Sequence, residues 1–349
     1  MPDVIFKEGV GEDNPVFGTY AHAIRMAIMH ESDAQTKKKG ILDYLYNVEK
    51  SNRISEATVG ERGFSTFEPK VEGANAVDDT VAQTFEKVIK HISFGKTFTI
   101  THEAATDSKN GLTADMRRIV EGFMRSYYMT RHLLGEKALI AGTGASFTFG
   151  TGANAKAIDT TVGDSLPLFS GEHTFYNEGI SGTQSNYFHK LDTSSAEAFS
   201  EHLSELSIKL RNFKDENGIP MAYTADTIIL PGNRGGLERM VKAVCGSERA
   251  AGSNKNDINI QFGNWNVVVL PTWSVSTDEI MIMSSDANKT LGANMFYQRE
   301  NLSIVNEIEK KSRNLVYNGY ARMGIGFTNW KHILRATAST TAVGTSIEI

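Results

Sequence analysis

The sequence from Gly63 to Gly73 reads Gly-Phe-Ser-Thr-Phe-Glu-Pro-Lys-Val-Glu-Gly, and the other parts of the chain are best interpreted around it. Apolar and charged residues mix here without a continuous apolar face, which is typical of an extended, exposed hairpin. Such an arm cannot bury its own apolar side chains, so a partner surface must cover it. We expect contacts between subunits from its apolar residues and its ionic rows, namely Arg62, Phe64, Phe67, Glu68, Lys70 and Glu72.

Helical segments are expected before the arm, from about residue 20 to 54. After it, strand signals run from 88 to 101, and Asn110-Gly111 predicts a turn. A long helix is then expected from Thr113 to Ala141, because its apolar residues fall at helical spacing and a glycine-rich segment ends it. At 1.5 Å per residue this helix would be roughly 40 Å long.

The second half of the chain mixes helices and strands without strict alternation, which favours an α+β fold over a doubly wound sheet. Ser194-Ser195-Ala196-Glu197 has capping-box spacing and predicts a helix that Asn217-Gly218 ends. From Leu315 onward, alternate residues as far as Phe327 can face one way, as in a strand. The other expected elements are a buried strand at 227–230, a helix at 236–244, an exposed loop at 246–256, and strands at 258–262, 266–270 and 279–283.

Composition excludes several classes of protein. The chain has 349 residues, of which 40% are hydrophobic and 22% charged, so wholesale disorder is excluded. A net charge of −5 argues against a dedicated nucleic-acid binder, although local basic patches remain compatible with it. No apolar run approaches the ~18–20 residues of a membrane span, and no membrane partner is expected. The single cysteine, Cys245, excludes an internal disulfide and a multi-cysteine zinc site.

The sequence contains fragments of catalytic motifs but no complete one. Ser93–Thr97 resembles a phosphate loop, but Lys90 stands where the first glycine is required. His102 begins a zinc-protease pattern whose second ligand position is Thr106. Cys245 as a nucleophile is a distant alternative, because lone cysteines are commonly small buried hydrophobic residues. We therefore expect no enzyme, no catalytic residue, no cofactor and no metal ion.

A basic stripe lies along the long helix. Arg117, Arg118, Arg125 and Arg131 fall within roughly 140° of one another at 100° per residue. The stripe could meet the phosphates of DNA or the carboxylates of a neighbouring subunit. The other interpretation is a solvated face that Glu121 and Glu136 neutralise, which is what a charged helix face usually indicates. Both interpretations stay open.

The order of these parts resembles the major capsid (head) proteins of tailed bacteriophages, which have the Hong Kong 97-type fold. The arm looks like the family's E-loop, and the helix at 113–141 looks like its spine helix. Leu166–His173, Leu-Pro-Leu-Phe-Ser-Gly-Glu-His, is similar to a stretch of the Mu-like head branch. The resemblance implies an N-terminal arm with helices at 1–57, the E-loop at 58–87, a peripheral domain at 88–190 and 300–335, an axial domain at 191–299, and a C-terminal tail at 336–349.

What the resemblance implies is self-assembly. Hexamers and pentamers would close an icosahedral shell around double-stranded DNA contacted non-specifically, with a portal as a further partner. The protein would be assembled as a procapsid in the bacterial host cytoplasm and would belong to the virion. Fewer than sixty residues precede Val59, so we expect a separate scaffolding protein. The alternative is an encapsulin-like compartment, which shares the fold but encloses enzymes.

Overall fold

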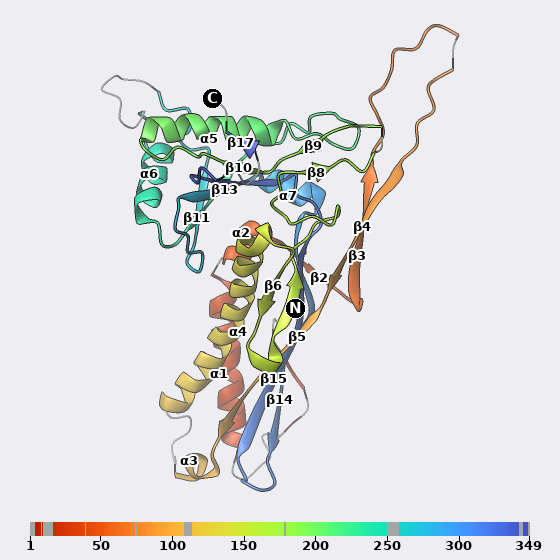
Figure 1. Ribbon diagram of the computed structural model, residues 1–349. Helices are drawn as coiled ribbons and strands as arrows, with labels where there is room; N and C mark the ends of the chain where they lie inside the picture. The colour runs from red at the N-terminus through yellow and green to blue at the C-terminus, as the bar shows by residue number, and fades with distance from the viewer. Residues whose placement is uncertain are drawn as a thin grey trace.

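The computed structural model describes residues 4–7, 9, 17–38, 40–73, 75–107, 114–177, 179–249, 258–341 and 345–347. The expected Asn110-Gly111 turn, Thr113 and most of the loop at 246–256 lie outside these ranges. The described chain forms the expected α+β fold, with a five-stranded sheet, a six-stranded sheet and three two-stranded ladders, one of which is a projecting hairpin (Figure 1). The two larger sheets form the body. One sheet runs along an elongated lower body, the other lies across its upper end, and the hairpin stands out to one side.

The lower sheet is built on one long antiparallel pair. β14 (Asn294–Ile308) pairs with β15 (Leu315–Phe327), and the expected inward positions of β15 are buried. The other strands of this sheet are β1 (Val4–Phe6), β2 (Asn47–Lys50) and β5 (Ile92–Ile100). The prediction of helix as far as residue 54 is wrong over β2, because pairing with Met295–Gln298 satisfies its backbone and overrides the local pattern.

The long helix is confirmed as α4, Ala114–Ile140, and it packs on α1 (Gly18–Thr36) and on the lower sheet. Its apolar positions Val120, Phe123 and Leu134 are buried. Two short helices, α2 (Ile41–Leu45) and α3 (His102–Asp107), lie near its two ends (Figure 1). Amphipathic periodicity is the strongest signal of secondary structure in this sequence, so α4 is the element that was predicted best.

The upper sheet has six strands in the order β12-β11-β13-β16-β10-β17. They are β12 (Asn266–Leu270), β11 (Thr227–Pro231), β13 (Glu279–Met283), β16 (Ile333–Thr337), β10 (Tyr187–His189) and β17 (Thr345–Ser346). α5 (Ala196–Arg211) and α6 (Gly235–Cys245) accompany this sheet, and Ser195 caps α5 by accepting a hydrogen bond from Ala198 N at 3.1 Å. β11 is buried throughout, as expected.

The end of one helix and the conformation of one segment differ from the predictions in this part. α5 ends at Arg211, before Asn217-Gly218, since Met221 N and Ala222 N return to the carbonyls of Phe213 and Arg211. The expected strand at 258–262 is a turn. Its Asn259 side chain donates to the carbonyls of Val244 and Ser247, which is turn chemistry rather than strand pairing.

Strands from distant parts of the sequence meet in the upper sheet. β10 and β16 come from ranges expected in the peripheral domain and tail, yet they pair with each other, and β16 also pairs with β13. The division into domains itself stays a prediction. The remaining elements are β6 (Ser146–Phe149), β7 (Lys156–Asp159), β8 (His173–Thr174), β9 (Thr183–Gln184), α7 (Ser285–Leu291) and two 3₁₀ turns at Ala141–Thr143 and Gly152–Asn154.

Candidate assembly surface

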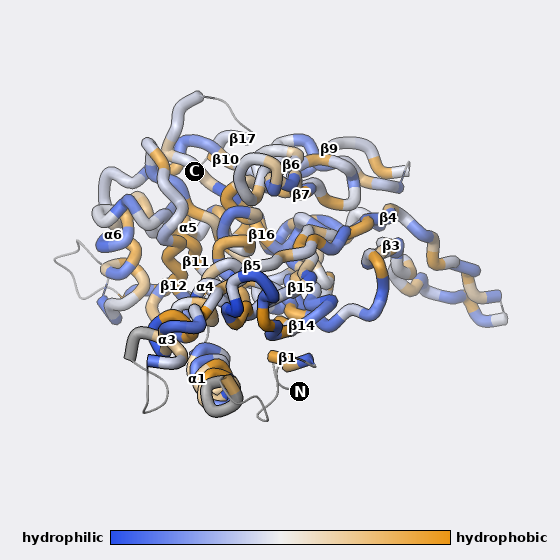
Figure 2. The backbone as a smooth tube through the Cα atoms, turned by 90° about the horizontal axis from the view of Figure 1, so that it is seen from below, coloured by the Kyte–Doolittle hydropathy of each residue, from blue (hydrophilic) through white to orange (hydrophobic). Residues whose placement is uncertain are grey.

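The expected arm is present as a hairpin that leaves the body. β3 (Ser55–Arg62) and β4 (Ala82–Lys90) pair antiparallel, so the strands extend a few residues beyond the predicted range of 58–87. Between them, the described residues of 63–81 contain no strand or helix. We call this segment the arm tip. Both views show it far from the packed core (Figures 1 and 2).

The arm tip exposes large apolar side chains. Phe67 is fully exposed, and the exposed fractions of Phe64 and Val71 are 66% and 76%. Burying a side chain of this size contributes about 1.5–3 kcal/mol of favourable free energy. A partner surface that covered the arm tip would therefore be stabilised by these side chains. Among the other residues expected to contact a neighbour, Arg62 is half-buried, whereas Glu68, Lys70 and Glu72 are exposed.

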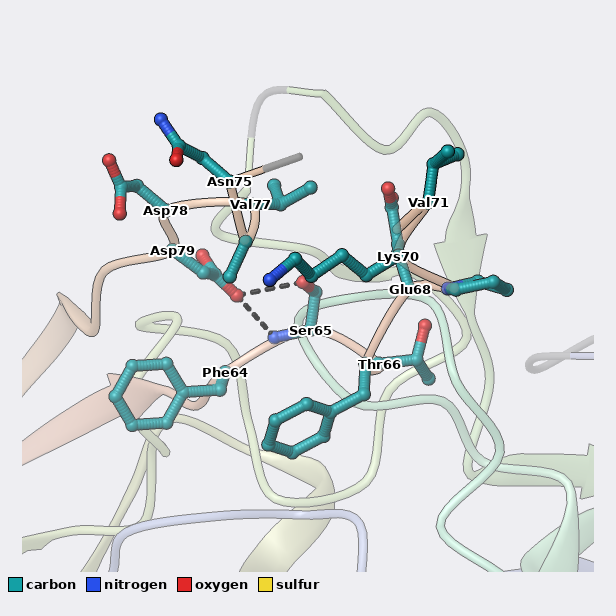
Figure 3. A pocket seen from close by; sticks show the side chains of 13 residues that line it. Phe64, Ser65, Thr66, Glu68, Lys70, Val71, Asn75, Val77, Asp78 and Asp79 are labelled. Carbon is teal, nitrogen blue, oxygen red and sulfur yellow. Dashed lines mark hydrogen bonds between the residues drawn. The ribbon is translucent and has the colours of Figure 1, made fainter. Parts of the chain in front are cut away.

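A short polar contact closes the arm tip at its base (Figure 3). Asp79 Oδ2 accepts hydrogen bonds from Ser65 N at 2.6 Å and from Ser65 Oγ at 2.7 Å. These bonds lower the pKa of the Asp79 carboxyl, and the bond from the Ser65 backbone has the larger effect. The tip encloses a hollow of about 570 Å³. Sequence reasoning missed Asp79, since only the turn of the chain brings it opposite Ser65.

The root of the arm is fastened to the body. Lys87 is buried, and its Nζ donates to Asp159 Oδ2 at 2.6 Å and to Thr161 Oγ1 at 2.7 Å. Burial alone would raise the pKa of Asp159, but the bonds from Lys87 and Thr161 outweigh it and lower the pKa. Phe85 packs so closely on Gly163 that a Cβ there would lie 2.1 Å from its ring. The arm therefore projects from a fixed base.

A second attachment lies where the arm tip begins. Asn217 Nδ2 donates to the carbonyl oxygens of Gly63 at 3.1 Å and of Phe64 at 3.3 Å. Asn217 belongs to the turn after α5, so the upper layer also steadies the arm. Sequence reasoning assigned Asn217 only a helix-ending role, because nothing local indicates contact with a segment more than a hundred residues away.

The basic stripe is divided by its surroundings. Arg117 and Arg118 are exposed on the first half of α4. Arg125 Nε donates to Glu31 Oε1 at 3.0 Å and its Nη2 donates to Glu121 at 3.4 Å. Arg131 is half-buried, and its guanidinium lies over the Tyr127, Tyr128 and Phe296 rings at 5.9, 5.8 and 5.6 Å from their centroids.

Of the two glutamates expected to neutralise the stripe, only Glu121 contacts one of its arginines among the ion pairs of the described residues. Glu136 is buried and accepts a hydrogen bond from Thr272 N at 3.2 Å. It therefore joins α4 to the turn after β12 instead of balancing surface charge. Arg117, Arg118 and Arg125 are exposed, and of these Arg125 forms ion pairs with Glu31 and Glu121.

Chemistry at Cys245 is disfavoured by its surroundings. The thiol lies buried at the end of α6, and this burial raises its pKa to about 11, so the nucleophilic thiolate is scarce at neutral pH. In the described ranges, His, Cys, Asp and Glu side chains form no cluster of three or more able to hold a metal ion. No helix in the same part of the chain has the length and apolar character needed to cross a membrane.

Comparison with known proteins identifies the fold. No protein-family model and no curated protein sequence matches the chain. A chain from the structure of Mycobacterium phage Patience is similar, with 14% identity, a TM-score of 0.51, and coverage of 97% of this chain and 94% of that one. A chain in the capsid structure of the cyanophage P-SCSP1u has 11% identity and a TM-score of 0.50, covering 86% of this chain and 88% of that one. Both similarities extend over most of the elements described above.

Proposed function

We propose that this chain, which has the Hong Kong 97-type capsid fold, is a major capsid protein whose copies form the shell of a tailed-phage head. Copies would assemble into hexamers and pentamers that close an icosahedral shell around double-stranded DNA. The observation that supports the proposal best is the exposure of Phe64, Phe67 and Val71 in the arm tip. The root of the same arm is held to the body by the bond from Lys87 to Asp159. The narrower assignment to the Mu-like branch stays a prediction.

The energetics favour a partner that is a copy of the chain. Each copy that covers a neighbour's arm also has an arm that another copy must cover. The apolar side chains of every arm tip are therefore buried only when the assembly closes on itself. Repeated many times in one shell, contacts worth about 1.5–3 kcal/mol per apolar side chain become large in sum. A monomeric protein would gain nothing from keeping these residues exposed.

Expression of the chain alone tests this proposal. Size-exclusion chromatography followed by negative-stain electron microscopy should show closed shells, tubes or capsomer rings. A stable and homogeneous monomer would refute the assembly role. The same preparation can be repeated with a co-expressed scaffolding protein, which we expect to increase the fraction of closed shells.

The contents of the particle test the phage assignment. Arg117 and Arg118 are exposed on α4 and would contact the phosphates of packaged DNA without reading its sequence. In particles from a host that supplies a portal and packaging proteins, we expect nuclease-protected double-stranded DNA. Particles that instead contain one abundant enzyme and no protected DNA would contradict the phage role and indicate an encapsulin-like compartment.

A further inference from the structure

A histidine ring with two hydrogen-bond acceptors beside it lies in the interior of the chain. His173, which ends the Leu166–His173 stretch and begins β8, is completely buried. Its Nδ1 lies 2.6 Å from Asp164 Oδ2, and its Nε2 lies 3.2 Å from Asn186 Oδ1. The imidazole stacks on the Trp330 ring, with centroids 4.3 Å apart and 6° between the ring planes. Both ring nitrogens therefore face an oxygen atom.

The orientation of the Asn186 amide is fixed by three backbone groups. Its Nδ2 donates to the carbonyl oxygens of Leu168 at 2.7 Å and of Ile333 at 3.2 Å. Its Oδ1 accepts a hydrogen bond from Ser170 N at 2.9 Å. Turning the amide over would lose all three bonds. The atom that faces His173 Nε2 is therefore an oxygen, which accepts and cannot donate, so Nε2 must carry a proton.

The Asp164 carboxylate sets the same requirement for the other ring nitrogen. Its Oδ1 already accepts a hydrogen bond from Leu166 N at 3.0 Å, and its Oδ2 faces His173 Nδ1. The distance of 2.6 Å between Oδ2 and Nδ1 is short, as in a hydrogen bond between two charged groups. A neutral imidazole has one N–H only, so one of its nitrogens would place a lone pair against an acceptor in a buried site. The site needs two donors, and an imidazolium supplies both.

The surroundings of the ring suit a positive charge. The face of the Trp330 indole, on which the imidazole stacks, attracts cations. Since a carboxyl group gives up its proton more readily than an imidazolium does, the proton between Asp164 and His173 belongs on the ring. His332, in the turn that carries Trp330, adds no charge at neutral pH, because burial lowers its pKa to about 3. The other charged groups of the segments around the ring are the ion pairs Lys331–Glu216 and Arg335–Glu279 and the exposed or half-buried Glu172, Lys214 and Asp215.

The same histidine holds the segment on which the arm is fastened. We call residues 159–165 the arm-root segment, because it accepts the bonds from the buried Lys87 of β4. Its last turn contains Ser165 at a φ of 66°, in the left-handed region that favours glycine. Backbone strain of this kind persists only where the surrounding contacts enforce it. The bond between His173 and Asp164 is one of these contacts.

We propose that His173 is a proton-binding site, and that its imidazolium, bonded to Asp164 and Asn186, is a proton-dependent latch on the arm-root segment. The latch acts within one folded subunit and does not rest on how copies assemble. Loss of the proton would leave a ring lone pair against an oxygen, so the segment loosens and holds β4 less firmly as the pH rises. A neutral ring is satisfied only if a donor replaces the carboxylate, and Asp164→Asn supplies one through its amide.

Nitrogen NMR of the histidine rings tests the proton directly. The chain is labelled with isotopic histidine, and the His173 signals are those that His173→Gln lacks and that Asp164→Asn shifts. At pH 7 we expect two protonated ring nitrogens for His173 in wild type, and only Nε2 protonated in Asp164→Asn. The spectra are recorded in solution on unassembled chains or in the solid state on particles, so the result does not depend on shell formation. A neutral His173 ring in wild type would overturn the proposal.

Hydrogen exchange tests the latch on the arm. The protection of the β4 backbone amides, corrected for the intrinsic effect of pH on exchange, should fall about tenfold once the His173 ring gives up its second proton. Asp164→Asn should keep its β4 protection over the same pH range, because its ring needs no second proton. The amides of β12, in the other part of the upper sheet, are the internal control and should not change. Unchanged protection of β4 in wild type after the ring has lost this proton, or an equal fall in Asp164→Asn, would refute the latch.

Discussion

The Nζ atom of Lys87 on β4 lies 2.6 Å from Asp159 Oδ2 on β7, and this ion pair joins the projecting arm to the body. The Lys87 side chain is only 8% exposed, whereas that of Asp159 is 56% exposed. The ammonium has therefore lost most of its hydration and depends on Asp159 and Thr161 for compensation. The contact holds the base of a segment whose far end is free.

The two partners of this pair should differ in their effect on stability. Asp159→Asn leaves a buried cation without its counter-charge and should lower the free energy of unfolding by about 1–2 kcal/mol. Lys87→Met fills the same space without a charge and should cost less. Equilibrium denaturation of the unassembled chain measures both. Lys90→Met, an exposed change on the same strand, is the control and should stay within about 0.5 kcal/mol of wild type. A larger loss for Lys87→Met than for Asp159→Asn would contradict this account.

Stability should fall on acidification because of His332. Burial lowers the pKa of this imidazole from 6.5 to about 3, against a smaller opposing effect of a backbone hydrogen bond with Asn329. Below pH 6.5 the unfolded chain therefore binds a proton that the folded chain excludes, so folding loses stability as the pH falls toward 3. From pH 7 to pH 5 the loss from this one group should be about 2 kcal/mol. Urea denaturation across this range should show it in wild type but not in His332→Leu, and parallel pH curves for the two would refute it.

Removing an aromatic ring from the arm tip should weaken assembly without weakening the fold. Phe67→Ser changes a fully exposed side chain, so the free energy of unfolding should stay within about 0.5 kcal/mol. Each subunit contact should lose about 1.5–3 kcal/mol, which raises the concentration needed for assembly roughly 10- to 100-fold. Light scattering against concentration measures the onset. Ile208→Ser, an exposed apolar change on α5, is the matched control, and an unchanged onset for Phe67→Ser would rule out the arm as a contact.

The exposed end of the basic stripe should bind DNA through charge alone. The double change Arg117→Gln with Arg118→Gln should weaken binding to duplexes of any sequence and reduce the salt-dependence slope by about 2. Arg125→Gln should leave the slope nearly unchanged, because Glu31 and Glu121 already hold that guanidinium. Fluorescence anisotropy of capsomers with labelled DNA at several salt concentrations measures the slopes. If the double variant matches wild type, the stripe is a solvated face.

Cys245 should be inert in the folded protein. With a pKa of about 11, roughly one thiol in a thousand is ionised at pH 8, and burial restricts access to it. Maleimide labelling should therefore be slow in the native chain and fast in urea. Cys245→Ala should assemble as wild type does. Rapid native labelling would revive the enzyme hypothesis.

Elements with strong local patterns were predictable from the sequence. The repeat of Val120, Phe123 and Leu134 indicates α4 without knowledge of its partners, since helix periodicity is a property of neighbouring residues. The strand at Asn47–Lys50 was missed for the opposite reason. Its conformation depends on Met295–Gln298, about 250 residues later, and no local signal carries that pairing.

The residues of the candidate assembly surface were likewise predictable only in part. Exposure at Phe64 and Phe67 follows from an apolar content that the segment cannot bury by itself, so the arm and its apolar residues could be predicted. Arg131 shows the limit, because helical spacing placed it in a basic stripe while the ring of Phe296 from β14 lies beneath its guanidinium. A helical wheel gives a direction on one helix but not what lies in that direction.

By itself the sequence determined that this chain has a long amphipathic helix, a buried strand at 227–230 and an arm in need of a partner, because periodicity and the balance of apolar and polar residues act over a few neighbours. Only the tertiary structure decided where that arm is attached to the body and which strand stands at the edge of the six-stranded sheet. Lys87 meets Asp159 across 72 residues, Asn217 meets Gly63 across 154, and β12 lies at the edge of its sheet in the described chain because of the order of the strands. Contacts of that range arise when the whole chain packs, since closing long loops is repaid only by the complete core.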